Sequence, residues 1–260
     1  MSFLTIDDVW KSYADVQILE RLTLKVEQGE FVSMVGASGC GKTTLLKMIL
    51  GSEQPTRGQI QLEDQPISPE PNQARGIVFQ KYSVFPHLSV LQNVMIADEF
   101  TAARFLGRTF GKQKQQIADK AIGFIEAVGL SHAIHKYPHQ LSGGMQQRLA
   151  IAQALMKSPK ILLLDEPFGA LDPGIRKDMH QLIHKVWKEN NLTIFMVTHD
   201  IQEGFELGSR LWVFDKVRHD PQAPTAYGAQ ITYDLALNSE KQQQAGQTLA
   251  KKYAKKVVNL

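Results

Sequence analysis

Apolar positions follow two different patterns over residues 1–80. Residues 22–26 alternate apolar and polar side chains, which is typical of a β-strand with one buried face. Residues 31–35 are apolar almost throughout, as in a strand buried on both faces. Further strands are predicted at 3–6, 60–62 and 76–80, and a helix over 43–50. This part of the chain is therefore expected to be rich in strands.

The spacing of apolar residues becomes helical between about 90 and 156. One stripe contains Ile117, Ala121, Phe124, Ile125 and Val128, and the Gly129 that follows suits a helix C-cap. The basic stretch 100–116 is expected to be an exposed helix or loop. We interpret 89–156 as a helical subdomain inserted into the rest of the fold.

Strands and helices alternate again after Pro159. Strands are predicted at 161–164, 192–197 and 211–214, with helices at 173–189 and from about 201. Such alternation predicts an α/β fold with a mainly parallel sheet and helices on both faces. The stretch from Ser239 is basic and low in complexity, and we expect a terminal helix there, with lipid headgroups or a partner protein as an alternative contact.

Composition and charge narrow the class of protein. The chain has 260 residues, 43% hydrophobic and 21% charged, as in ordinary globular proteins, and its net charge of +3 is too small to indicate nucleic-acid binding. Cys40 is the only cysteine, so no intrachain disulfide forms and a reducing compartment is expected. No secretory signal or membrane-spanning stretch is recognisable, which predicts a cytoplasmic protein that reaches a membrane only through a partner.

A glycine-rich segment after the 31–35 strand matches the phosphate-binding pattern G-x-x-x-x-G-K-[ST]. The candidate nucleotide-binding residues are Gly36, Ala37, Ser38, Gly39, Cys40, Gly41, Lys42, Thr43 and Thr44. Glycines let backbone N–H groups converge on phosphate oxygens at the positive end of a helix. Lys42 would contact the β- and γ-phosphates, and the Thr43 hydroxyl would ligate Mg²⁺.

Two acidic residues, Asp165 and Glu166, follow the aliphatic strand at 161–164. Downstream of a phosphate-binding loop, one carboxylate is expected to hold Mg²⁺, while its neighbour polarises the attacking water. Without that loop, the pair would read as a helix-capping turn.

A second anion-binding helix start is predicted at Ser142, Gly143 and Gly144, before a helix over 145–156. A serine cap with flexible glycines explains the serine, but not the paired glycines or the Gln147 and Arg148 that follow. One ATP bound by one chain leaves this site without a task.

Taken in order, these three segments resemble the ABC-type ATPases, and the resemblance covers about residues 3–215. It implies ATP and Mg²⁺ as cofactors and a head-to-tail homodimer, in which Ser142, Gly143 and Gly144 act in trans on ATP held by the other chain. The implied ABC ATPase domain is 1–235, with a P-loop NTPase core at about 1–88 and 157–235. The resemblance also implies an N-terminal antiparallel β subdomain, the helical subdomain at 89–156, and a basic tail at 236–260.

Further residues match the family one by one. Tyr13 corresponds to an aromatic that stacks on adenine, although ordinary strand packing would also explain it. Gln80 resembles a glutamine that contacts Mg²⁺ and water, and Asp172, in the segment 170–172, resembles a loop crossing between subunits. His199 resembles a histidine that senses the γ-phosphate, where spacing alone would suggest a structural role.

Two positions depart from the usual family pattern. Met145 replaces a common glutamine, which favours importers of nitrate, sulfonate, taurine and similar anions. Gly204 stands where alanine is more usual, and an exposed helix glycine costs about 1 kcal/mol relative to alanine.

The segment 80–88 is apolar and aromatic and joins the core to the helical subdomain, which indicates a docking surface. The resemblance implies integral membrane permease subunits there, a peripheral location on the cytoplasmic face of the membrane, and indirect contact with a substrate-binding protein. A soluble ABC-type ATPase not coupled to transport is the alternative. The cargo stays open between an anion and a urea- or amide-type compound, to which the 214–234 segment bears a faint resemblance.

Overall fold

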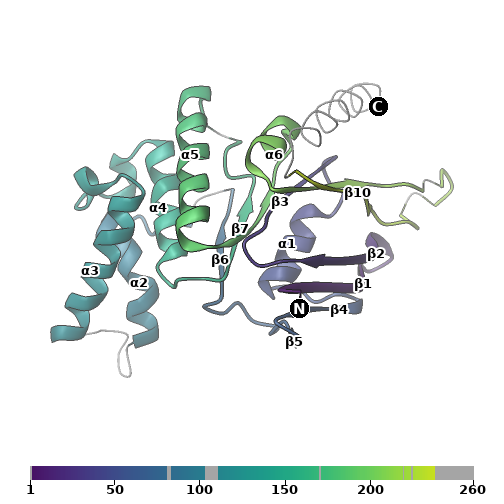
Figure 1. Ribbon diagram of the computed structural model, residues 1–260, viewed down its shortest axis with the longest axis horizontal. Helices are drawn as coiled ribbons and strands as arrows, with labels where there is room; N and C mark the ends of the chain where they lie inside the picture. The colour runs from purple at the N-terminus through teal and green to yellow at the C-terminus, as the bar shows by residue number, and fades with distance from the viewer. Residues whose placement is uncertain are drawn as a thin grey trace. The chain divides into compact units, whose positions relative to one another are not determined.

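The computed structural model describes residues 2–80, 83–102, 111–169, 171–218, 220–223 and 225–237, without the side chains of 100–102 (Figure 1). These residues fall into two compact units. The first combines the described parts of 1–72 and 191–260, and the second those of 73–190. The predicted terminal helix after Ser239 lies outside the described residues, as do 103–110 of the predicted exposed stretch.

An antiparallel sheet of four strands lies in the first unit and confirms the predicted N-terminal β subdomain. Its strands, in the spatial order β2-β1-β4-β5, are β1 Leu4–Tyr13, β2 Val16–Val26, β4 Arg57–Leu62 and β5 Gln65–Pro66. Alternate residues of β1, among them Leu4 and Ile6, are fully buried, as expected for a strand with one apolar face.

The predicted parallel strands pair around β3 Phe31–Gly36 in the same unit. β8 Thr193–Val197 and β9 Arg210–Asp215 lie parallel to β3 on either side. Every residue of β3 except Gly36 is buried, which confirms the interpretation of its apolar run. Helices α1 Lys42–Leu50 and α6 Ile201–Leu207 belong to this unit.

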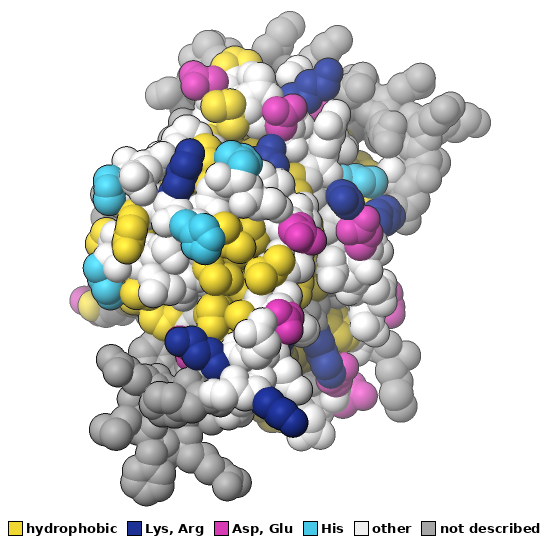
Figure 2. All heavy atoms as spheres, turned by 90° about the vertical axis from the view of Figure 1, so that its left-hand side faces the viewer, with side chains coloured by type: hydrophobic (Ala, Val, Ile, Leu, Met, Phe, Trp, Pro, Cys, Tyr) yellow, Lys and Arg dark blue, Asp and Glu magenta, His cyan; other side chains and the backbone are white. Residues whose placement is uncertain are grey.

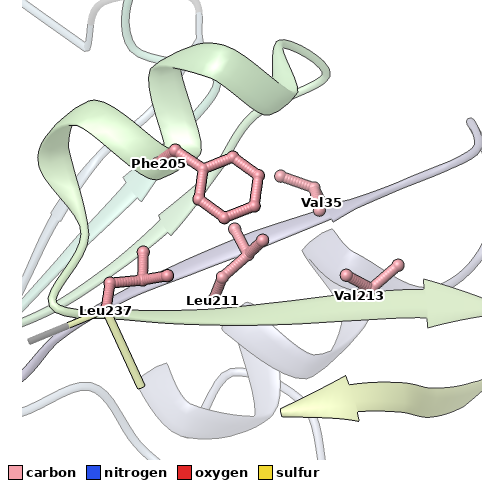
Figure 3. Packing of buried hydrophobic residues seen from close by; sticks show 5 residues of the cluster. All are labelled: Val35, Phe205, Leu211, Val213 and Leu237. Carbon is pink, nitrogen blue, oxygen red and sulfur yellow. The ribbon is translucent and has the colours of Figure 1, made fainter. Parts of the chain in front are cut away.

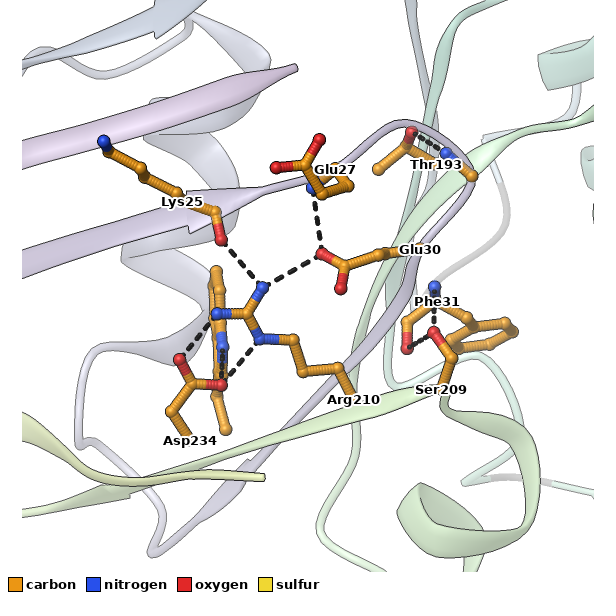
Figure 4. A network of polar contacts seen from close by, with 10 residues as sticks. Lys25, Glu27, Glu30, Phe31, Thr193, Ser209, Arg210 and Asp234 are labelled. Carbon is orange, nitrogen blue, oxygen red and sulfur yellow. Dashed lines mark hydrogen bonds and ion pairs between the residues drawn. The ribbon is translucent and has the colours of Figure 1, made fainter. Parts of the chain in front are cut away.

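Besides the two-residue β5, the chain adds a strand that the sequence pattern did not predict: β10 Gln230–Ala236, antiparallel to β9. A cluster of polar contacts joins it to the unit (Figure 4). Arg210 donates from Nε and Nη2 to the two carboxylate oxygens of Asp234, both at 2.6 Å, and from Nη1 to Lys25 O at 2.7 Å and Glu30 Oε2 at 3.0 Å. Trp212 Nε1 also donates to Asp234, at 3.0 Å.

Buried side chains from three elements pack between α6 and the β3–β9 pair. Figure 3 shows Val35, Phe205, Leu211, Val213 and Leu237 in this cluster. The expectation of an exposed Gly204 is wrong, because this residue is buried. A Cβ there would lie 3.0 Å from Leu211 Cδ1 and 3.1 Å from Val35 Cγ1, so glycine allows the helix to approach the sheet closely.

The second unit pairs two parallel strands with the predicted helices. The strands are β6 Arg75–Val78 and β7 Ile161–Asp165, and the helices are α2 Val90–Ala102, α3 Gly111–Ala127, α4 Gly143–Leu155 and α5 Pro173–Asn190. On α3, the stripe residues Ile117, Ala121 and Ile125 are buried, and Gly129 follows with φ 73°. In the described part of the chain, no helix is both long and apolar enough to cross a membrane.

Candidate nucleotide-binding site

Two glycines of the 36–44 loop are required by close packing. Gly36 has φ 149°, and a Cβ there would lie 2.4 Å from the carbonyl oxygen of Phe214 on β9. Gly41 has φ 85°, and its Cβ would lie 2.6 Å from Leu19 Cδ2 on β2. A side chain at Gly36 would collide with the backbone of β9, and one at Gly41 would displace the Leu19 side chain. The loop therefore runs tightly between β3 and α1, as the sequence predicted.

The start of α1 is suited to an anion. Its N-cap is Gly41, which brings no side chain to cap the helix, and its first turn holds no acidic residue. The first N–H groups of α1 therefore present the positive end of the helix dipole. Lys42 is buried and donates from Nζ to Gly36 O at 2.8 Å and Ala37 O at 2.9 Å. Positive charge is thus concentrated inside the loop.

The rest of the loop is open. Ala37, Ser38 and Gly39 are exposed, and Thr43 and Thr44 are half-buried at the start of α1. A Cβ at Gly39 would meet nothing within 4 Å, so this glycine is set by its φ of 75° and not by packing.

Cys40 lies on the buried side of the loop. Its Sγ is 3.6 Å from Lys42 Nζ. Burial raises the pKa of the Cys40 thiol, and the nearby Lys42 ammonium opposes that rise without cancelling it. The thiol is therefore protonated at neutral pH and weakly nucleophilic.

Tyr13 and His199 are exposed residues of the first unit. Tyr13 ends β1 with 41% of its surface exposed, which does not fit ordinary packing in a strand core. His199 is exposed in the turn between β8 and α6. That turn is fixed on both sides of it: Thr198 Oγ1 is 2.5 Å from Glu203 Oε2, and Asp200 caps α6 by accepting from Gln202 N and Glu203 N.

The second unit brings two predicted catalytic residues together. Gln80 Nε2 donates to Glu166 Oε2 at 3.1 Å, because the parallel strands β6 and β7 end at the same edge. Asp165 is the half-buried last residue of β7. Glu166 has φ 47°, a left-handed conformation that costs a residue with a Cβ about 1–2 kcal/mol. Strain of this kind is concentrated at functional sites.

At the start of α4, some residues are fixed by packing or capping and others have free space around them. Ser142 caps the helix by accepting from Met145 N at 3.3 Å. A Cβ at Gly144 would lie 2.6 Å from Ile175 Cγ2 of α5, whereas one at Gly143 would meet nothing within 4 Å. Ser142 and Gly143 are exposed.

The structure revises the argument that a serine cap leaves the rest of this segment unexplained. Buried Gln147 donates to Pro167 O, which follows Glu166 in the chain, and Arg148 donates to Val128 O at 2.9 Å. Packing therefore accounts for Gly144, Gln147 and Arg148, and Gly143 is the member of the segment that no contact explains.

Asp172 is exposed just before α5, and its carbonyl accepts from Arg176 N at 2.9 Å. Its neighbour Ala170 lies outside the described residues. Two residues beside the predicted site had not been identified: Lys11 and Glu53 pair at 2.9 Å. They are 42 positions apart, and no local pattern signals such a pair.

Together, the fold and the 36–44 loop define a P-loop nucleotide-binding protein. The family model for ABC transporters matches residues 19–169 of the chain. The chain therefore belongs to the ABC transporter family, which confirms the resemblance on which the sequence interpretation was based.

Relatives and solved structures agree with this assignment. The nitrate import ATP-binding protein NrtD of Synechococcus elongatus is 43% identical over 213 residues, which cover 80% of this chain and 75% of NrtD. The bicarbonate transport ATP-binding protein CmpC of the same species is 43% identical over 215 residues, but this chain spans only 31% of CmpC's length. The dimeric ATP-binding cassette MJ0796, bound to ADP and phosphate, matches with a TM-score of 0.72 at 27% identity, over 91% of this chain and 99% of that one.

Proposed function

We propose that this protein is the ATP-binding and ATP-hydrolysing subunit of an ABC importer, coupling hydrolysis to solute transport through a separate permease. One observation carries most of the proposal: Gln80 and the strained Glu166 lie in hydrogen-bond contact at the end of β7. Family membership and the phosphate-binding loop identify ATP as the molecule on which this pair would act.

Phosphate binding is assigned to the 36–44 loop. Its backbone N–H groups and the Lys42 ammonium would hold the phosphates, and the exposed ring of Tyr13 would stack on adenine. Thr43, Gln80 and Asp165 would hold Mg²⁺, which neutralises charge that develops on the phosphates. Among the described residues, no group of three or more acidic, histidine or cysteine side chains forms a metal site of its own. The set of Thr43, Gln80 and Asp165 suits Mg²⁺, because this ion takes few protein ligands together with phosphate oxygens.

Water activation is assigned to Glu166 as the general base, with its carboxylate oriented by Gln80. His199, on its fixed turn, would contact the γ-phosphate. As in the predicted dimer, Ser142, Gly143 and Gly144 would close on ATP held by a second copy, and Asp172 would lie in the loop that crosses between the copies. The Ser142 hydroxyl accepts from Met145 N and keeps its own hydrogen to donate to a phosphate oxygen.

Coupling to a permease is assigned to the 80–88 segment. A cavity of about 330 Å³ in the second unit is lined mostly by apolar residues: Ile77, Val78, Phe79, Ser83, Phe85, Ile96, Ala97, Ala150, Gln153 and Ala154. Phe79 and Phe85 are exposed, and the buried side chain of Asn93 holds the 85–89 backbone through four hydrogen bonds. Figure 2 shows the face on the side of α2 and α3, where apolar side chains gather centrally among histidine and charged residues. Lys81 and Tyr82 lie outside the described residues.

An exposed apolar recess of this kind is typical of a surface that receives a partner protein, which supports the importer over a soluble ATPase that is not coupled to transport. An importer subunit of this kind would lie at the cytoplasmic face of the membrane and would contact a substrate-binding protein only indirectly. NrtD and CmpC are named for nitrate and bicarbonate, which together with Met145 favours a small anion over a urea- or amide-type compound as the cargo.

The test is ATP turnover with and without the cognate permease. Glu166→Gln should bind ATP and lose about two to four decades of turnover, the scale expected for a general base. Phe85→Asp should keep the turnover of the isolated subunit and lose co-purification with the permease. Undiminished ATP turnover in Glu166→Gln would show that Glu166 is not the general base. If turnover does not depend on the permease, and Phe85→Asp changes neither turnover nor co-purification, the soluble ATPase would be favoured.

A further inference from the structure

We propose that Lys11 and Glu53 are positioning residues for Tyr13, which hold its ring so that one face is closed by an ammonium group and the other is presented to the base of the nucleotide. The inference rests on the proposed function, because it assigns a task to residues beside the proposed adenine contact. All three residues belong to the first unit.

The Lys11 ammonium is fixed on three sides. It is buried, donates to Glu53 Oε2 at 2.9 Å and to Gln54 O at 2.7 Å, and lies 4.7 Å from the centroid of the Tyr13 ring. A lysine ammonium has three donors, so this arrangement leaves it little freedom to move. One face of the Tyr13 ring is thereby occupied.

Glu53 connects this ring to the helix that begins at Lys42. Its backbone N–H donates to Lys47 O at 3.3 Å, just beyond the end of α1. Partial burial and the negative charge of Glu53 raise the pKa of the Tyr13 phenol, and the positive charge of Lys11 opposes that rise. A displacement of the pair would move the ring relative to the phosphate-binding loop.

The chemistry of the pair suits base stacking. An ammonium over one face of a tyrosine attracts π electron density toward itself, and the opposite face then stacks more favourably on an electron-rich purine. Glu53 compensates the charge that Lys11 buries, which would otherwise be costly. An ion pair that merely joined β1 to the end of α1 would not need a ring at this position.

The chain offers a matched control on the same strand. Arg57 also lies over an aromatic ring, with its Cζ 5.7 Å from the Trp10 centroid, and it also pairs with a carboxylate, Asp8, at 2.9 Å. Trp10 and Arg57 have no role in the proposed site. Arg57→Met therefore removes a more exposed cation–ring contact away from the nucleotide, while the Cζ of Arg21 stays 5.6 Å from the same ring.

The experiment measures KM and kcat for ATP, together with inhibition by inorganic tripolyphosphate, in the full chain. Lys11→Met and the isosteric Glu53→Gln should raise KM for ATP about three- to tenfold with kcat unchanged, because a stacking contact contributes to binding and not to the chemical step. Lys11→Arg should restore KM to within about twofold, since the cation over the ring is retained. Tripolyphosphate, which has no base, should inhibit all variants equally.

Three outcomes would overturn the inference: an unchanged KM in both variants, an equal weakening of tripolyphosphate inhibition, or the same rise in KM for Arg57→Met. Thermal unfolding of each variant shows that the compared proteins are folded, and Glu53→Gln keeps the test decisive if Lys11→Met does not fold. Absence of turnover in the unmodified protein would instead refute the proposed function, so the two failures are distinguishable.

Discussion

Two aspartates of the first unit each contact an arginine and a tryptophan, but in different surroundings. Asp234 pairs with Arg210 and accepts from Trp212 Nε1, and Asp8 pairs with Arg57 and accepts from Trp10 Nε1 at 2.9 Å. The first pair has side-chain exposures of 33% and 16%, and Trp212 is fully buried, whereas the exposures of Asp8 and Arg57 are 43% and 70%. Replacing each aspartate by asparagine keeps the shape of the side chain and an oxygen that accepts from the indole, but removes the negative charge.

The expected cost differs because of burial. Asp234→Asn removes the charge from two short hydrogen bonds and leaves the guanidinium of Arg210 with Glu30 as its remaining anionic partner. Breaking a partly buried pair with two charge-assisted hydrogen bonds costs about 1.5–3 kcal/mol, whereas an exposed pair contributes about 0–1 kcal/mol. Asp8→Asn should therefore lower the free energy of unfolding by less than about 1 kcal/mol.

Urea unfolding of the two variants, followed by tryptophan fluorescence, measures this difference. Amide hydrogen exchange locates it, because Asp234→Asn should release protection mainly in β9 and β10, which the network joins. Equal costs for the two substitutions, or a cost below 1 kcal/mol at Asp234, would show that burial does not control the strength of these pairs.

Two further predictions concern titratable groups. Burial alone would raise the pKa of Glu20, but hydrogen bonds from Arg218 and Gln230 outweigh burial and lower that pKa. The stabilisation that ionised Glu20 provides is therefore present above the ordinary glutamate pKa, and it is lost as the pH falls through the pKa of the folded state. Acid unfolding of Glu20→Gln should accordingly show a smaller loss of stability below about pH 4 than the unmodified chain, and identical pH profiles would contradict this. Because Cys40 is buried with a raised pKa, maleimide should label it far more slowly in the folded protein than in urea, and more slowly still with ATP bound. Labelling of the folded chain at the rate of an exposed thiol would refute that geometry.

Much of the fold was predictable because apolar runs mark buried strands without reference to distant residues. β3 and β7 were recognised in this way, and the loop and the acidic pair that follow them were placed correctly at the strand ends. β10 was missed although Ile231, Tyr233 and Leu235 alternate with other residues, because this short edge strand is held by its pairing with β9 and by the contact of Asp234 with Arg210, 24 positions away. The local pattern of apolar and polar residues does not indicate such a distant partner.

The same limit applies to two glycines whose packing the sequence did not predict. Gly204 was interpreted from helix propensity, but its surroundings are set by Val35 and Leu211 on two other elements. Gly144 was attributed to anion binding, although the close approach of Ile175 also requires it. Gln80 and Glu166 meet because β6 and β7 are neighbouring parallel strands; the sequence predicted parallel strands, but not that these two are neighbours.

The central claim is that each nucleotide is held jointly by two copies of the chain. The most direct measurement is the molar mass of Glu166→Gln by light scattering with saturating Mg-ATP, with and without the permease, beside the same variant carrying Lys42→Ala as a control that cannot bind phosphate. We predict a dimer that requires both ATP and Lys42. A protein that stays monomeric with ATP bound, alone and on the permease, would contradict the shared site.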